Sequence, residues 1–334
     1  MANISTSYLG LSLRSPLVAS ASPISKKLEN VAKLEEAGIG AVVVYSLFEE
    51  QILHEQAERD HFLSRATNVN PEALDYFPDL GSYNLEPDRY LAHLAAIRKA
   101  VEVPVIGSIN GVTKGGWTEW AKRIEDTGVH ALELNVYSVP TDPVVDGAAV
   151  EARVVDLVSE VVGKVRIPVS VKLSPFYSSI PNLVSRIGAA GAKGVVLFNR
   201  FLQPDLDPEN LSVQSTAKLS DSSDLNLPLR WTAILAGRVA PQIALSGGVG
   251  TGRDLLKALL AGAQVGQVAS AVLANGPDAV GRILSQLGEW MDEHEYESVD
   301  QLRGSMSQKK VVDPTAFERA QYMRALTSLD DRFV

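Results

Sequence analysis

The chain has 334 residues, of which 46% are hydrophobic and 6% aromatic, and it contains no cysteine. A disulfide framework, a thiolate zinc site and a cysteine nucleophile within this chain are therefore excluded. The net charge of −9 and the lack of any lysine- and arginine-rich run argue against binding to nucleic acid or to an anionic membrane. We expect a cytoplasmic protein, because the amino terminus has no signal-peptide pattern and no stretch approaches the length of a membrane span.

Short apolar runs rich in β-branched residues recur along the chain, and a helical pattern follows each of them. Near-continuous apolar character is typical of strands that are covered on both faces. Several of the helical segments end in glycine, as in EAG at 36–38 and DTG at 126–128. The eight predicted strands are residues 16–22, 41–48, 104–110, 131–137, 168–175, 194–200, 242–248 and 264–270.

Eight strand-then-helix units in one chain of this length predict a (β/α)8 TIM barrel, with an open doubly wound sheet as the alternative. Residues 5–13 alternate around a glycine and predict a hairpin that closes the bottom of the barrel. Residues 49–98 form an insertion between the second and third strands, whose length and position suggest a loop that covers the substrate. We assign residues 1–299 to the barrel.

Residues 300–334 are predicted to form a C-terminal helical extension. Its helix carries Phe317, Met323 and Leu326 toward one side. An isolated helix of this length is marginally stable in water. We therefore expect the helix to pack either on the barrel or on a partner subunit.

Two turns near the end of the predicted barrel are built from small residues. SGGVGTG follows the seventh strand and VASA follows the eighth, so backbone N–H groups are exposed around Gly247, Gly248, Ala269 and Ser270. This is the position at which barrels of this class commonly bind a phosphate group. The alternative is that the glycines only form tight turns.

Other polar residues stand at the predicted carboxyl ends of the strands, where barrel enzymes place their active sites. Lys172 interrupts the apolar strand VSVKLSP, so it should face an anion or ligand, unless it extends past the strand end into solvent. Asn110, Asn135 and Asn199 are either satisfied core amides or ligand-binding amides at one rim. The five histidines show no metal-ligand spacing, and we expect no metal site.

Four of these segments resemble the FMN-dependent dihydroorotate dehydrogenases. PLVASAS is similar to the opening strand of that family, and PVSVKLSP to its flavin-lysine strand. The most specific match is ALSGGVGTGRDLLKALLAGA followed by QVGQVASAVLANGP, which resembles the phosphate end of the family. NVYS resembles the start of its Asn-x-x-(Cys/Ser)-Pro-Asn motif.

The resemblance implies FMN as cofactor and oxidation of dihydroorotate, or a related dihydropyrimidine, to orotate in pyrimidine biosynthesis. Lys172 would stabilise the negative charge of the reduced flavin, and Ser138 would take a proton from carbon 5 while carbon 6 gives hydride to the flavin. A homodimer is the family expectation. The residues implied to bind FMN are Ala19, Ser20, Ser22, Ser46, Asn110, Asn135, Lys172, Asn199, Gly247, Gly248, Ala269 and Ser270; those implied to bind the substrate are Asn84, Asn135 and Asn199.

The chain also departs from the family pattern around the substrate. Tyr45 precedes Ser46 where the family has a lysine, and Val139-Pro140 follows Ser138 where the family has Pro-Asn. These departures leave open a non-catalytic or substrate-shifted FMN-binding barrel, and they leave the substrate and electron acceptor unassigned. A serine hydroxyl is also a weak base, so Ser138 needs a proton relay through water or Thr141.

A flavin-free aldolase or isomerase, with Lys172 as a Schiff-base or general-base lysine, is a further alternative. We rank it below the flavin enzyme, because the sequence motifs place no second acid or base near that lysine.

Overall fold

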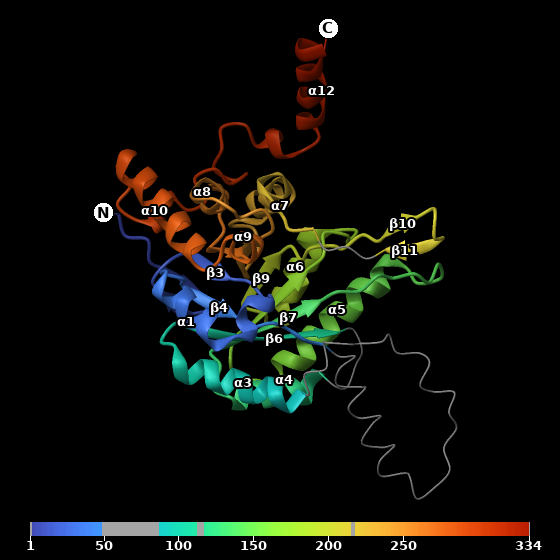
Figure 1. Ribbon diagram of the computed structural model, residues 1–334. Coiled ribbons are helices and arrows are strands. Elements are labelled where there is room, and N and C mark those ends of the chain that lie inside the picture. The colour runs from blue at the N-terminus through green and yellow to red at the C-terminus, as the bar shows by residue number, and fades with distance from the viewer. Residues whose placement is uncertain (1, 49–86, 112–116, 215–217, 334) are drawn as a thin grey trace, which may run out of the picture.

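Eight parallel strands close into a barrel in the computed structural model, which describes residues 2–48, 87–111, 117–214 and 218–333 (Figure 1). Each strand pairs with the next, and closure comes from the pairings of β13 with β3 and of β4 with β6. The predicted (β/α)8 barrel is thus confirmed, and the open-sheet alternative is wrong. The strands are β3 (Leu17–Ala19), β4 (Ala41–Val43), β6 (Val105–Gly111), β7 (Ala131–Val136), β8 (Val169–Leu173), β9 (Gly194–Leu197), β12 (Gln242–Ser246) and β13 (Val265–Val268).

Helices surround this barrel and cover its outer face (Figure 1). A short strand, β5 (Leu47–Phe48), pairs with the carboxyl end of β6. The helices are α1 (Leu28–Glu36), α3 (Pro87–Ala100), α4 (Trp117–Asp126), α5 (Gly147–Val162), α6 (Ile180–Ala189), α7 (Asn226–Leu235), α8 (Gly252–Ala261), α9 (Ser270–Asn275) and α10 (Asp278–Glu293), with 3-10 turns η1 (Pro23–Lys26) and η4 (Ser222–Leu225).

The bottom of the barrel is filled with apolar side chains. The hairpin of β1 (Thr6–Tyr8) and β2 (Leu11–Leu13) packs Tyr8 and Leu13 against the inward-facing Val18, Val196 and Ala244. This arrangement confirms the predicted hairpin and its place. This apolar layer fills the bottom of the barrel, so a ligand site inside it is expected at the carboxyl ends of the strands.

Side-chain alternation decides which residues of a strand enter the barrel. On β7, Leu132 and Leu134 belong to the core between strands and helices, whereas Ala131 lies in the bottom layer inside the barrel. Because successive side chains point to opposite faces of a strand, Glu133 and Asn135 also face inward. The interior therefore changes from apolar to polar toward the carboxyl ends.

The C-terminal segment first runs along the barrel and then leaves it. In α11 (Val299–Leu302) both terminal side chains are buried, and Met306 N–H donates to the carbonyl of Leu260. After η5 (Pro314–Phe317), helix α12 (Ala320–Phe333) projects away from the barrel (Figure 1). Met323 and Leu326 are exposed, so they do not pack on the barrel.

The domain boundary at residue 299 stays a prediction, as does contact of α12 with a partner subunit. Residues 49–86 of the expected substrate-covering loop lie outside the described residues. Residues 87–98, which we had included in that loop, instead form most of the barrel helix α3, because Tyr90, Leu94 and Ile97 give them a buried helical face.

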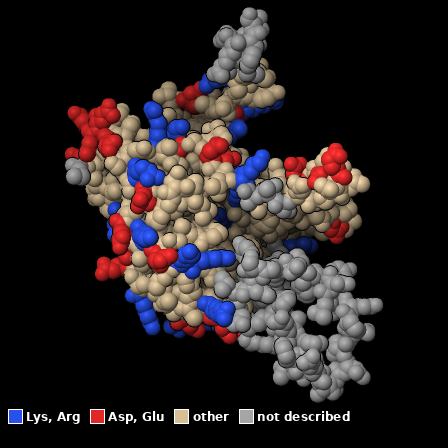
Figure 2. All heavy atoms as spheres, viewed as in Figure 1, with Lys and Arg blue, Asp and Glu red and all other residues tan. Residues whose placement is uncertain are grey.

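Surface charge and helix length complete the description. Figure 2 shows basic and acidic side chains interspersed over the face in view, with acidic ones gathered near the hairpin of β10 (Asp205–Asp207) and β11 (Ser212–Gln214). Among the helices within the described ranges, none combines the length and the apolar character needed to span a membrane.

Candidate active site

A cavity of about 460 Å³ opens at the carboxyl ends of the strands; we call it the rim cavity. Its walls come from residues far apart in the sequence, which the barrel brings together. Seven of the residues expected to bind FMN line it: Ser20, Lys172, Asn199, Gly247, Gly248, Ala269 and Ser270.

The two small-residue turns form one end of the rim cavity. Gly247 and Gly248 have φ of +99° and +81°, a left-handed conformation that glycine adopts without strain. A Cβ added to Gly247 would meet nothing within 4 Å, so the backbone there faces open space. A Cβ on Gly248 would lie 2.4 Å from the nitrogen of Leu225, so this glycine is required for packing. Gly248 is therefore needed to form the turn, whereas Gly247 leaves room for a ligand, and phosphate binding there stays a prediction.

The turn after β12 leads directly into helix α8. Thr251 accepts a hydrogen bond from Asp254 N–H, and the Asp254 carboxylate accepts one from Thr251 N–H, which closes a capping box at the start of the helix. On the neighbouring turn, the Ser270 hydroxyl accepts a hydrogen bond from Ser220 N–H at 2.9 Å. These bonds fix both turns, so the backbone groups that face the cavity are held in place.

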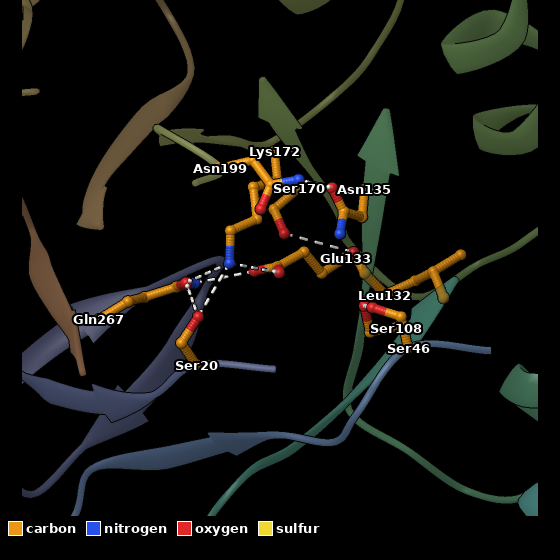
Figure 3. Close-up of polar contacts among 10 residues, drawn as sticks. All are labelled: Ser20, Ser46, Ser108, Leu132, Glu133, Asn135, Ser170, Lys172, Asn199 and Gln267. Carbon is orange, nitrogen blue, oxygen red and sulfur yellow. Dashed lines mark hydrogen bonds and ion pairs between the residues drawn. The ribbon is translucent and has the colours of Figure 1, made fainter. Parts of the chain in front are cut away.

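Lys172 also lines the rim cavity, and this residue is 4% exposed (Figure 3). Its ammonium donates to Ser20 Oγ at 2.8 Å and to Gln267 Oε1 at 3.3 Å. It also forms an ion pair with Glu133, whose Oε1 lies 3.5 Å from Nζ. The lysine therefore points into the barrel. The alternative that it extends past the strand end into solvent is wrong.

Asn135 and Asn199 meet across the rim. Asn199 Nδ2 donates to Asn135 Oδ1 at 2.8 Å (Figure 3), and Asn135 stands directly opposite Lys172 in the register of β7 and β8. Each amide keeps one polar atom that forms no hydrogen bond within the described part of the chain: Oδ1 of Asn199 and Nδ2 of Asn135. The pair can therefore offer a ligand one acceptor and one donor.

Ser46 lies deeper, in a hydroxyl pair below the rim. Its Oγ is 2.8 Å from Ser108 Oγ (Figure 3), and both side chains are buried. Tyr90 OH donates to the Ser108 carbonyl and accepts from the Ser108 N–H. Burial raises the pKa of Tyr90, so this hydroxyl stays neutral and acts as a fixed structural donor.

Ser138 does not line the rim cavity but an adjoining space of about 240 Å³, which we call the side pocket. The side pocket is also lined by Ser174 and Tyr177. Phe176 and Phe201 line both cavities, and their rings meet edge to face at 4.7 Å. Thr141, the relay partner suggested by the sequence, is exposed and is not part of the side pocket.

Five expected site residues that the structure describes line neither cavity: Ala19, Ser22, Ser46, Asn110 and Asn135. Ala19 is buried in the core between strands and helices, and Ser22 is buried with an Oγ that has no partner among the described residues. Asn110, the last residue but one of β6, pairs with Asn135 and is half-buried. Asn84 lies outside the described residues.

Glu133 and Gln267 belong to the site although the sequence analysis did not select them. Both are polar residues inside apolar strands, ALELNV and VGQV, which is the signal that selected Lys172. The expectation that no second acid or base lies near Lys172 is wrong, because strand β7 places Glu133 beside it. The two residues are 39 positions apart in the chain and become neighbours only through strand pairing.

The donors around the rim cavity fit FMN. The open backbone at Gly247, together with Ala269 and Ser270, suits a phosphate group, since bare N–H groups at such turns bind anions. The Lys172 ammonium suits a ring that becomes negative on reduction.

Fold and site together define a class: a (β/α)8 barrel enzyme with a phosphate-type cradle at its last two strands and a buried ammonium at the rim. The comparisons with known proteins make this specific. The chain belongs to the dihydroorotate dehydrogenase family, because the family model described as "Dihydroorotate dehydrogenase" matches residues 3–291. It is accordingly an oxidoreductase that acts on a CH–CH group.

Curated relatives are similar over most of the chain at modest identity. The "Dihydroorotate dehydrogenase B (NAD(+)), catalytic subunit" of Thermoplasma volcanium is 26% identical over 312 residues, covering 91% of this chain and 98% of that protein. The protein of the same name from Halalkalibacterium halodurans is 31% identical, covering 65% of this chain and 71% of its own. A "Putative dihydroorotate dehydrogenase A (fumarate)" of Aeropyrum pernix is 28% identical, covering 63% and 70% respectively.

Proposed function

We propose that this oxidoreductase binds FMN in the rim cavity and oxidises dihydroorotate, or a closely related dihydropyrimidine, to orotate. The observation that carries the proposal is that one cavity combines the open turn at Gly247 with the ammonium of Lys172. Bound FMN would supply the hydride acceptor. Lys172 would then stabilise negative charge on the ring, as a preplaced donor does at a developing anion.

The amide pair of Asn135 and Asn199 would orient the substrate ring. A dihydropyrimidine carries alternating N–H and C=O groups, and the pair offers one acceptor and one donor to such an edge. Because Asn199 also lines the rim cavity, the bound ring would lie beside the cofactor.

Ser138 would remove the proton at carbon 5 from its place in the side pocket. A serine hydroxyl needs a partner that accepts its proton. Ser174 and Tyr177 share the side pocket with Ser138, whereas Thr141 does not. We therefore assign the relay to a path through the side pocket and not to Thr141.

The test is an absorbance spectrum of the purified protein before and after anaerobic addition of dihydroorotate. The proposal predicts flavin absorbance that bleaches on addition, with orotate formed in equal amount. A flavin that keeps its colour with dihydroorotate and other dihydropyrimidines contradicts the assigned reaction, and a protein that binds no FMN contradicts the whole proposal.

The second candidate is an FMN barrel with a different substrate or with none. Tyr45 favours it: the ring meets Tyr90 edge to face at 5.2 Å, so it fills with apolar packing a position where the family resemblance expects a lysine. This candidate predicts bound FMN without bleaching by dihydropyrimidines. Turnover of dihydroorotate that disappears in Ser138→Ala contradicts it.

We also propose a cytoplasmic homodimer. Support for the dimer comes from α12, whose Tyr322, Met323 and Leu326 are all exposed on a projecting helix. Light scattering of the full chain tests the assembly, and a monomer at micromolar concentration contradicts it.

A further inference from the structure

Glu133 is a buried carboxylate inside the barrel, with a side chain that is 1% exposed. It faces the interior between Ser108 and Ser170 in the registers of β7 with β6 and β8. Asn135, two residues further along β7, stands opposite Lys172. Glu133 is therefore one layer deeper in the barrel than Lys172, and the Lys172 side chain extends toward its carboxylate (Figure 3).

Both oxygens of Glu133 are used in one continuous network with Lys172 (Figure 3). Oε1 pairs with the ammonium at 3.5 Å, and Oε2 accepts a hydrogen bond from Gln267 Nε2 at 2.8 Å. Gln267 Oε1 in turn accepts from Ser20 Oγ at 3.0 Å and from Lys172 at 3.3 Å. Glu133 thus holds Lys172 directly and through Gln267.

The three donors of the Lys172 ammonium all have partners in this arrangement: Ser20, Gln267 and Glu133. The contact with Glu133 is the longest of the three, at 3.5 Å. A ligand that accepts from this ammonium therefore competes most easily with Glu133. The ammonium would then be shared between Glu133 and the ligand.

Stability does not explain why this ion pair is buried. Two charges lose their hydration on burial, and an apolar pair of similar volume is often as stable or more stable. A bound flavin would give the pair a function, because reduction of the ring would add negative charge that Lys172 would stabilise. The carboxylate opposes that charge and offsets part of the field of the ammonium.

We propose that Glu133 is a positioning residue that fixes the Lys172 ammonium and sets the reduction potential of the flavin bound above it. The inference rests on the proposed function, because it needs FMN in the rim cavity. With Glu133 present, the midpoint potential of the flavin would be lower than the Lys172 ammonium alone would make it. Glu133 acts through Lys172 and does not touch the reacting atoms.

The test compares the midpoint potential of the FMN-loaded wild type with that of Glu133→Gln by anaerobic titration against reference dyes. In the variant, we expect the equilibrium between oxidised and reduced flavin to shift toward the reduced form at least about tenfold. This corresponds to a rise in midpoint potential of about 30 mV for a two-electron couple. Affinity for sulfite, which makes the oxidised flavin anionic, should rise in the same direction. Glu125→Gln is the control, since that carboxylate binds backbone N–H groups before β8 at the bottom of the barrel and should leave both values unchanged.

A double-variant comparison separates positioning from a general loss of packing. In a Lys172→Met background, the further change Glu133→Gln should raise the potential much less than it does with Lys172 present, because most of the effect of Glu133 acts through the ammonium. A potential in Glu133→Gln equal to that of the wild type, with FMN bound, overturns the inference and leaves the proposed function standing. Absence of FMN binding in the wild type overturns both.

If Glu133→Gln does not fold, Glu133→Asp is the second variant. Its shorter side chain draws the carboxylate back from the ammonium, and we expect the midpoint potential to rise. An unchanged potential in that variant also overturns the inference.

Discussion

Asn199 donates a hydrogen bond to Asn135 across the barrel rim, and this single 2.8 Å contact fixes the orientation of both amides. It joins the segment after β9 to strand β7, 64 residues earlier in the chain. With this bond made, Asn199 keeps a free Oδ1 at the rim cavity and Asn135 a free Nδ2, counting partners within the described part of the chain. The amide pair is thus preorganised for a ring with one donor and one acceptor along its edge.

Removing one amide of the pair should impair substrate binding more than it lowers the stability of the fold. In Asn199→Ala we expect kcat/KM for dihydroorotate to fall about 10- to 100-fold, the usual effect of one or two lost hydrogen bonds. Thermal stability should stay near wild type, because Asn199 is half-buried at the rim. Steady-state kinetics with measured FMN occupancy checks this, and an unchanged kcat/KM contradicts the role of the pair.

The buried ion pair predicts strong coupling in stability. Lys172→Met leaves Glu133 without its cation, and a broken buried pair typically costs about 3–5 kcal/mol. The double variant Lys172→Met/Glu133→Gln should recover most of that loss. Urea unfolding of the FMN-free wild type, the two single variants and the double variant measures the four unfolding free energies of this double-mutant cycle. If the two single effects add in the double variant, the residues do not act as a pair.

Lys172→Ala should also weaken FMN binding and slow flavin reduction. The ammonium would no longer offset the negative charge of the reduced ring. Titration with FMN and stopped-flow reduction measure the two effects. Affinity and reduction rate both equal to those of the wild type contradict the role given to Lys172.

The two glycines of the β12 turn should respond differently to substitution. Gly247→Asn keeps a residue that tolerates positive φ but fills the open cradle, so FMN affinity should fall at least about tenfold with little loss of fold. Gly248→Ala should destabilise the fold itself, because its Cβ would meet Leu225. The matched control is Gly10→Asn, which also has positive φ and open space but lies in the hairpin β1–β2. Equal FMN affinity in Gly247→Asn and Gly10→Asn contradicts a phosphate site at this turn.

Ser138→Ala should lower kcat at least about 100-fold while FMN binding is retained, because a positioned base contributes this much or more. Thr141→Ala should keep kcat within about twofold, since Thr141 is exposed and outside the side pocket. Anaerobic reduction by dihydroorotate, followed in a stopped-flow instrument, measures the step. A large loss in Thr141→Ala would return the relay to that residue.

His130 should make stability depend on pH at the bottom of the barrel. Its Nδ1 accepts a hydrogen bond from Val105 N–H at 3.0 Å, while burial and then the nearby Arg98 lower its pKa below 6.5. The unfolded chain therefore takes up a proton first as pH falls, and the stabilisation present above pH 6.5 is lost below it. His130→Asn keeps an acceptor but cannot titrate. If the unfolding free energies of the wild type and of His130→Asn change by the same amount between pH 7.5 and 5, His130 is not the cause of the pH dependence.

The barrel could be predicted from the sequence because its signals are local. Apolar strands, glycine-ended helices and eight repeats of one unit lie in consecutive residues. The same is true of the small-residue turns at Gly247 and Ser270, and of Lys172 as one charge in an apolar strand.

The polar network around Lys172 could not be predicted in full, because its members meet only through strand pairing. Glu133 lies 39 residues from Lys172, and Gln267 lies 95 residues from it. The alternation of ALELNV does identify Glu133 as an inward-facing charge once β7 is known to line a closed barrel. The division of Ser138 and Lys172 between two cavities follows from Phe176 and Phe201, which no motif indicated.

The central claim is that the turns after β12 and β13 bind the phosphate of FMN. The most direct measurement is the dissociation constant of the FMN-free protein for FMN and for riboflavin, which lacks the phosphate. We predict that FMN binds at least about 100-fold more tightly, as expected for the loss of one or two charge-assisted hydrogen bonds. Equal affinity for the two flavins, or no binding of either, would contradict the account.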